Sequence, residues 1–229
     1  MSDQTQGFTL VNLEMVKNNS QIRRYLGIGD CYLEKIGAIQ HDEPHALLVA
    51  ESSREILTKL GHPQRDTELA AIAGYLHDIG NLVNRYNHGL TGAILAFNLL
   101  NELGMDPEEL AVIMSAIGNH EENTGGNPVN NVTAAVILAD KSNVHRSRVR
   151  KSDPATFTPR DRVNYAVEQT CLEVLPEEKL IAMKLKIDQN ICSVMEYFEI
   201  FLTKMILCRR AAAALGCQFE LLINDAKLL

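Results

Sequence analysis

The sequence predicts a mainly α-helical protein that ends in a small α+β module, and two observations lead to this fold class. Between about residues 9 and 145, apolar residues recur at helical spacing between Asn, Asp, Pro and Gly residues suited to helix ends. From about residue 166, β-rich stretches surround one long helical stretch. We therefore expect a helical domain over residues 1–150, a linker over 151–165 and an α+β module over 166–229.

The first elements of the helical domain are short. From about Thr9 to Ile39, helical patterns alternate with Gly and Asn residues. The stretch Asn18-Asn19-Ser20 could cap one helix and Asp30 a second one, and these helices would form a lid or packing layer. A stronger helix begins at Pro44 and runs to Gly61, a natural stop.

Four more helices are expected before residue 145, each with a start or stop signal at one end. They cover about residues 66–78, 88–103, 106–119 and 132–144. The third has Asp106 as its cap and a proline next, and it delivers His120 at its end. The connection from Asn81 to Asn87 is polar.

The C-terminal module is expected to have ββαβ or ββαββ order. Its elements are two strands at 167–174 and 180–187, a helix from about Asn190 to Leu215 capped by Asp188, a strand at 217–223, a turn at Asn224-Asp225 and a short strand at 226–229. The Met and Phe stripe of the long helix could pack on the hairpin or form the seam of a homodimer.

Composition limits the class of protein. The chain has 229 residues, of which 46% are apolar and 22% charged, as is typical of a soluble globular protein. The formal net charge of -7 argues against general binding to nucleic acid or anionic membranes.

Targeting signals and cysteines indicate the compartment. The five cysteines are scattered without CxxC spacing, which favours a reducing cytosol over disulfides or a thiolate zinc site. The polar N-terminus has no apolar stretch typical of a signal peptide, and charged residues interrupt the apolar runs short of a membrane span. We expect a cytoplasmic protein.

His77 and Asp78 follow the apolar run Leu69–Ala73. An imidazole and a carboxylate at the inner end of a buried helix need compensation, and a divalent metal is the commonest one. The alternative is an ordinary helix end, with Asp78 at the surface and Gly80 as the stop.

Six residues of metal-binding type fall at helix ends or in apolar runs on consecutive helices: His45, His77, Asp78, His88, His120 and Asp140. Asp140 is the most informative, because the preceding residues Val136–Ala139 are apolar and a buried carboxylate needs a cation or several donors. Considered alone, His45 could be a core histidine.

The stretch from about Pro44 to Val144 resembles the HD-domain superfamily of metal-dependent phosphohydrolases. The minimal pattern of that family is His, then His-Asp, then Asp, and His45, His77-Asp78 and Asp140 match it in order. The resemblance implies an all-helical HD bundle with its core at about 44–145.

Two-metal members of the superfamily add two histidines before the last aspartate, and His88 and His120 stand in those places. The sequence of residues 77–80, His-Asp-Ile-Gly, is similar to the corresponding motif of the HD-GYP phosphodiesterases. However, Asn81 replaces their usual Lys, and 126–128 read Gly-Asn-Pro in place of Gly-Tyr-Pro. The resemblance therefore implies a two-metal site and gives little support for cyclic di-GMP hydrolysis.

The resemblance implies which of the six residues would bind each metal ion. One metal would take His45, His77 and Asp140, the other His88 and His120, with Asp78 as the bridging and catalytic carboxylate. Two ions about 3.5–4 Å apart would clamp a phosphoryl group and supply a hydroxide. Iron or manganese is expected first, with Zn, Ni, Co and Mg as further candidates. His41 could ligate a third metal or be an exposed loop residue.

Candidate phosphate ligands stand beside these residues: Lys141, Arg146, Arg148, Arg150, Asn81 and Arg85. Alternating arginines would present guanidinium groups along one side of an extended segment. The alternative is a solvated basic loop or a salt-bridged seam between domains. Glu121 and Glu122 could be partners of the histidines or proton carriers, or exposed acids at a helix end.

We expect a phosphohydrolase or phosphodiesterase acting on a small phosphorylated substrate such as a nucleotide, with no membrane partner. Some two-iron members of the superfamily are oxygenases with the same six ligands, which makes an oxygenase one alternative. A nucleotide sensor with little turnover is another, although a complete ligand set favours an enzyme.

Overall fold

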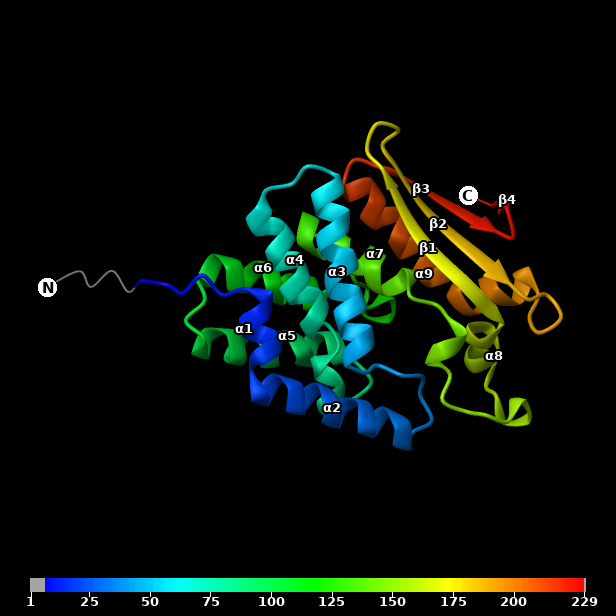
Figure 1. Cartoon of the computed structure of the whole chain (residues 1–229), viewed down its shortest axis with the longest axis horizontal. Coiled ribbons are helices and arrows are strands. Elements are labelled where there is room, and N and C mark those ends of the chain that lie inside the picture. Colours follow the sequence, from blue (N-terminus) through cyan, green and yellow to red (C-terminus); the bar gives the residue numbers. More distant parts are fainter. Residues whose placement is uncertain (1–6, 229) are drawn as a thin grey trace, which may run out of the picture.

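The computed structural model describes residues 7–228. It confirms the expected fold class, a helical bundle followed by a small α+β module (Figure 1). The helices are α1 (Leu13–Asn18), α2 (Ser20–Lys35), α3 (Glu43–Lys59), α4 (Gln64–Leu76), α5 (His88–Glu102), α6 (Pro107–Gly118), α7 (Asn131–Ser142), α8 (Pro159–Ala166) and α9 (Val194–Ala214). The strands are β1 (Val167–Leu175), β2 (Leu180–Ile187), β3 (Gln218–Ile223) and β4 (Ala226–Lys227).

Helix α4 is the centre of the bundle. Every residue from Leu69 to Leu76 is buried, and α3, α6 and α7 pack against this helix. A helix that is apolar on all sides is stable only inside a core. His77 and Asp78 follow α4 directly, so the expected site begins in the interior.

Helix α2 is continuous from Ser20 to Lys35, where two helices were expected. Asn19, one of the three residues expected to supply the first cap, caps α2. Asp30 lies inside this helix and accepts a hydrogen bond from the backbone nitrogen of His41 (2.8 Å). Gly29 is buried against the short 3₁₀ helix η1 (Ile79–Leu82), where a Cβ would stand 3.1 Å from the backbone nitrogen of Leu82. Gly29 thus permits the close approach of α2 and η1. The expectation of a second helix beginning at Asp30 was wrong, because α2 continues through this residue.

The C-terminal sheet has the strand order β1-β2-β3-β4. The β1–β2 and β3–β4 pairs are antiparallel, whereas β2 and β3 are parallel and are joined through α9. This confirms a ββαββ order. Asn224 and Asp225 form the last turn, with φ values of 50° and 65° that these two residue types tolerate. Helix α9 also packs on α7, which connects the module to the bundle.

Helix α9 begins later than the sequence indicated. Asp188 was expected to cap it, but this carboxylate accepts from the backbone nitrogen of Asn190 (2.9 Å) in a preceding turn. Ser193 is the cap and accepts from the backbone nitrogen of Glu196. A serine followed three residues later by glutamate is a strong start signal, and it prevails over Asp188.

The stretch expected as a linker, 151–165, contains most of a further helix, α8. Thr158 and Asp161 form a reciprocal capping box at its start, and Pro159 occupies the first turn. This signal was present in the sequence and was missed. Within residues 7–228, no helix is long and apolar enough to cross a membrane.

Candidate metal centre

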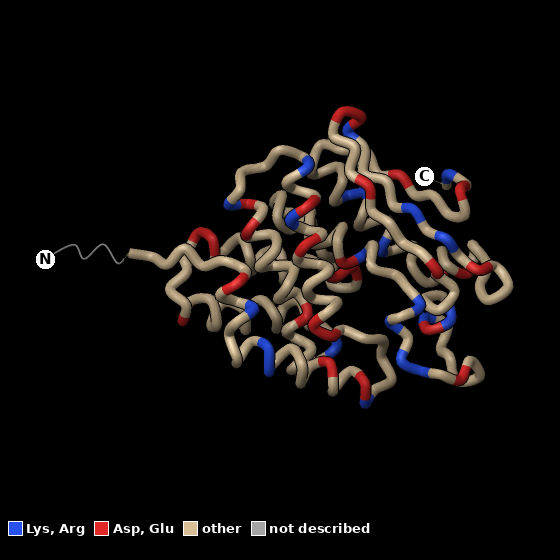
Figure 2. Tube along the Cα trace, in the orientation of Figure 1, with Lys and Arg blue, Asp and Glu red and all other residues tan. Residues whose placement is uncertain are grey.

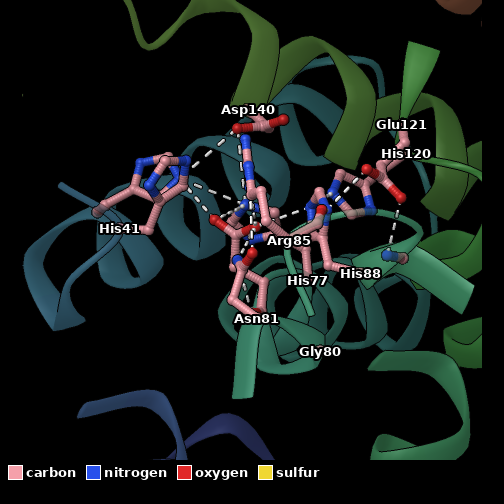
Figure 3. Close-up of polar contacts among 12 residues, drawn as sticks. His41, His77, Gly80, Asn81, Arg85, His88, His120, Glu121 and Asp140 are labelled. Carbon is pink, nitrogen blue, oxygen red and sulfur yellow. Dashed lines mark hydrogen bonds and ion pairs between the residues drawn. The ribbon is translucent and has the colours of Figure 1, made fainter. Parts of the chain in front are cut away.

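The six candidate ligands lie close together. Figure 3 labels four of them, His77, His88, His120 and Asp140. His45 lies in the first turn of α3, His77 and Asp78 follow α4, His88 begins α5, His120 comes two residues after the end of α6, and Asp140 lies in the last turn of α7. The Asp140 side chain is 13% exposed and the other five residues are buried. Five consecutive long helices thus each deliver one or two ligands to one place.

Asp78 stands between two pairs of histidines. Its Oδ2 atom lies 3.1 Å from His77 Nε2 and 3.4 Å from His45 Nε2. Its Oδ1 atom lies 3.0 Å from His88 Nε2, and His120 Nε2 is 3.0 Å from that same nitrogen. One carboxylate therefore reaches both pairs, as a bridging ligand would.

The orientation of the imidazoles tests whether a cation fits. His77 Nδ1 donates to the carbonyl of Gly74 and His120 Nδ1 to the carbonyl of Ile117, each at 2.7 Å. Because a carbonyl only accepts, the hydrogen of each neutral ring is on Nδ1 and the Nε2 lone pair faces the site. The Nε2 atoms of His45 and His77 are 3.3 Å apart. Lone pairs this close repel unless a proton or a metal ion lies between them.

Buried atoms without partners point to the same conclusion. Within residues 7–228, Asp78 Oδ2 and His45 Nδ1 are buried and form no hydrogen bond. Three groups of ligand atoms lie within 4.8 Å of one another: His45, His77 and Asp78; His77, His120 and Asp140; and Asp78, His88 and His120. These nitrogen and oxygen donors fit one or more divalent cations of the Fe, Mn, Co, Ni or Zn type.

The charges of the site also favour a cation. Burial opposes ionisation of Asp78, but His77 and His41 hold the pKa of this carboxyl well below its usual range. Burial likewise opposes a charged His77, yet Asp78 and Asp140 raise the pKa of this imidazole to about 10. The carboxylates therefore stay ionised and attract positive charge.

Two further side chains orient the ligands. Asn81 Nδ2 donates to Asp78 Oδ1 (2.9 Å). Glu121 approaches His88 Nδ1 at 2.7 Å and also accepts from the backbone nitrogen of Gly89 (3.0 Å). A hydrogen bond to the outer nitrogen of a ligating histidine orients its ring and makes it a better ligand.

Glu121 and Glu122 are not exposed acids, although that was one of the two expectations. Glu121 is 8% exposed, and the side chain of Glu122 is 9% exposed. Lys141 Nζ lies 2.9 Å from Glu122 and 2.8 Å from Asp140. Burial opposes the Lys141 charge, but these two carboxylates raise the pKa of its amine above the ordinary value. Lys141 is thus held between two acids.

The alternating arginines do not line up beside the ligands as expected. Arg148 is buried and donates to the carbonyls of Gln40 and Asn143. Arg150 pairs with Asp30, and Arg146 lies 3.4 Å from Glu168. Arg146 and Arg150 thus hold the loop to neighbouring segments and are not brought to the site, which agrees with the salt-bridged alternative.

Acidic and basic residues are interspersed along the described trace (Figure 2), so the charges near the ligands must be identified individually. A cavity of about 480 Å³ opens beside Asp78 and Asp140. Arg85, Lys141 and Arg148 line it. Asn81 is not among its lining residues but contacts both Asp78 and Arg85.

Two basic residues of this cavity, Arg160 of α8 and Lys204 of α9, were missed by sequence reasoning. Lys204 belongs to a helix whose apolar stripe indicated packing or a dimer seam, and no local pattern connects it to the ligands. Burial, together with the charge of Lys141, lowers the pKa of the Lys204 amine to about 7.

Two other features lie around His45. His41 lines the cavity, with its ring centre 5.6 Å from that of His45 and its Nδ1 2.7 Å from the Ile39 carbonyl. It belongs to none of the three ligand groups among the described residues. A second cavity of about 580 Å³ lies on the other side, between α3 and β1, and has His45 and Arg148 in its wall.

A comparison with protein-family models identifies the same part of the chain. Residues 44–153 match the family model described as the HD domain, a range that includes all six candidate ligands. No curated protein matches the chain. Among solved structures, a predicted HD superfamily hydrolase from an uncultured Thermotogales bacterium is similar, with 25% identity and a TM-score of 0.43. That match covers 58% of this chain and 73% of the other.

Proposed function

Because residues 44–153 match the family model of the HD domain, we propose that the chain is a member of the HD-domain superfamily and a metal-dependent phosphohydrolase or phosphodiesterase. The observation that carries the proposal is Asp78, placed between two pairs of histidine nitrogens that face each other. The substrate we propose is a small phosphate ester, for example a nucleotide.

The six residues would hold two divalent ions. His45, His77 and Asp140 would bind one ion, His88 and His120 the other, and Asp78 would contact both. When bound, such ions make water acidic enough to attack phosphorus and neutralise charge on the phosphoryl oxygens. We favour iron or manganese, although the same donors also accept zinc, nickel, cobalt or magnesium.

The other residues of the chain position the reacting groups. Asn81 orients Asp78 through its amide nitrogen, and Glu121 orients His88. Lys141 fixes Asp140. Arg85 lies 3.9 Å from Asp78 and lines the cavity, so its guanidinium is suited to bind the phosphoryl oxygens and orient them.

The experiment is elemental analysis of the purified protein, followed by a screen of phosphate esters under argon with the metal that is found. We expect bound metal and release of phosphate or a phosphomonoester, because hydrolysis needs no oxygen. Substrate-dependent oxygen consumption without phosphate release would identify an oxygenase. Nucleotide binding without turnover would identify a sensor.

Asp78→Asn isolates the bridging carboxylate at almost unchanged volume. We expect this variant to lose bound metal and at least about a hundredfold in turnover, since the ligand that both ions share loses its charge. Asp66→Asn, in the first turn of α4, the helix that Asp78 follows, is the matched control and should retain both. Equal metal content and turnover in the two variants would contradict the proposal.

A further inference from the structure

Two basic side chains reach the cavity from α8 and α9, outside the family match at 44–153. Arg160 comes from α8 and Lys204 from α9, and both line the cavity with Asp78 and Asp140. They meet at the ring of buried Phe201, with Arg160 Cζ 5.8 Å and Lys204 Nζ 4.5 Å from its centre. An aromatic face attracts cations, so one ring holds both groups at the cavity.

Neither cation has a carboxylate partner in the described part of the chain. The salt bridges within residues 7–228 include Lys141 and Arg85 but neither Arg160 nor Lys204. Arg148, the remaining basic residue of the cavity wall, is occupied by backbone carbonyls. Apart from Arg85, which we assign to the reacting phosphoryl group, Arg160 and Lys204 are therefore the basic groups of the cavity wall whose hydrogen-bond donors stay available to a ligand.

The acids of the cavity are already committed elsewhere. Asp78 and Asp140 face the histidines, Glu121 contacts His88, and Glu122 contacts Lys141. An unpaired cation in a partly buried position is unfavourable, and an anionic ligand group would supply the missing charge. Burial and then the charge of Lys141 lower the pKa of the Lys204 amine, although the charges of Glu122 and Asp140 act in the opposite direction.

We propose that Arg160 and Lys204 bind a second phosphate of the substrate, so that the preferred substrate carries a phosphate besides the ester that reacts. This proposal rests on the proposed function in one respect, namely that the reacting phosphate ester binds at the metal ligands. A guanidinium fork and an ammonium are the two side-chain groups that most often recognise phosphate. The cavity, at about 480 Å³, is within the usual range for a small-molecule site.

The test is calorimetric titration of the metal-loaded protein with alkane diphosphonates that have one to four methylene groups. Alkyl phosphonates of the same lengths are the matched ligands with a single anionic group. These probes are not hydrolysed, so binding is measured without turnover. We expect at least one diphosphonate to bind about tenfold or more tightly than its alkyl phosphonate, because charged hydrogen bonds have this strength.

The variants are Lys204→Met and Arg160→Gln, singly and together, each checked for unchanged metal content and circular dichroism. Each should weaken the diphosphonate by about tenfold and leave the alkyl phosphonate almost unchanged. Lys204→Arg, which keeps a positive charge, should retain the preference for the diphosphonate that Lys204→Met loses. Arg209→Gln, an exposed position on the same helix, is the control and should bind as the wild type does.

The two proposals fail in different ways. If folded variants keep the wild-type preference, or if the alkyl phosphonates weaken equally, the second phosphate site is wrong even though esters are hydrolysed. If no ester is hydrolysed while the preference depends on Lys204, the proposed function is wrong and the anion site stands. The single variants decide the question should the double variant not fold.

Discussion

Glu121 holds the ring of His88 through the outer nitrogen Nδ1, at 2.7 Å, and is itself fixed by the backbone nitrogen of Gly89. Burial opposes the charge of Glu121, but the hydrogen bond and the charge of His88 hold the pKa of this carboxyl below its usual range. An ionised acceptor makes the imidazole a stronger ligand. Glu121 is not itself an expected ligand, but through His88 it can raise the affinity of the site for a metal ion.

We expect Glu121→Ala to weaken metal binding by about 10- to 100-fold, the usual effect of removing such a partner. Glu121→Gln keeps an acceptor oxygen and should lose less. Competition with a chelator measures the affinity. Glu102→Ala, at the exposed end of α5, is the control and should match the wild type. A Glu121→Ala variant with wild-type affinity would show that the contact is not needed.

At the scale of elements, the site depends on how closely η1 and α5 approach each other. A Cβ placed on Gly80 would lie 1.9 Å from the carbonyl oxygen of His88 and 2.6 Å from the backbone nitrogen of Gly92. Backbone atoms cannot rotate away, so only glycine permits this contact. The approach places His88, the first residue of α5, opposite Asp78.

We expect Gly80→Ala to lower the free energy of unfolding by about 3 kcal/mol or more, because overpacking against backbone forces the elements apart. Gly27→Ala is the matched control in α2, where a Cβ meets nothing within 4 Å. This control should be neutral or stabilising by up to about 1 kcal/mol. Urea unfolding followed by circular dichroism measures both. Similar stabilities of the two variants would show that the backbone moves aside easily.

At the scale of the whole molecule, the C-terminal part is joined to the site. Helix α9 lies against both the sheet and α7 (Figure 1). From this helix, Lys204 lines the cavity. The division of the chain near residue 150 and the homodimer remain predictions from the sequence. Light scattering on the whole chain measures its mass in solution and so tests the homodimer.

The pKa of Lys204, about 7, leads to a pH dependence. Burial and the charges of Lys141 and Arg160 lower it, whereas Glu122 and Asp140 act in the opposite direction. Below pH 7 the amine is charged and binds an anion, and above pH 7 it loses this charge. Since a free lysine has a pKa of 10.5, the folded chain binds fewer protons between pH 7 and 10.5. The contribution of Lys204 to the free energy of unfolding therefore rises with pH in that window.

We expect the diphosphonate affinity of the wild type, relative to Lys204→Arg, to fall by up to about tenfold per pH unit above pH 7, because a guanidinium stays charged. The ratio of the diphosphonate affinities of the two proteins does not depend on the titration of the ligand itself. Calorimetry at several pH values measures this ratio. A ratio that is constant from pH 6 to 9 would show that the amine does not titrate there.

Most helices and the six candidate ligands could be predicted from sequence, because both depend on local information. Helical periodicity is visible within a few turns, and so is a His-Asp pair at the end of an apolar run. The misplaced start of α9 was an error in choosing between two nearby caps, Asp188 and Ser193. The missed helix α8 was a local signal overlooked. Neither error affected the ligands.

The sequence by itself determined which residues could ligate a metal and which helices carry them, because residue type and spacing are properties of the chain. Only the tertiary structure decided which charges remain available. Arg150 forms an ion pair with Asp30, and Arg148 donates to the carbonyl of Gln40, each more than a hundred residues away along the chain. Arg160 and Lys204 meet at Phe201 only after α8 and α9 pack together. A charge acts through what surrounds it in space, and those neighbours come from distant parts of the chain.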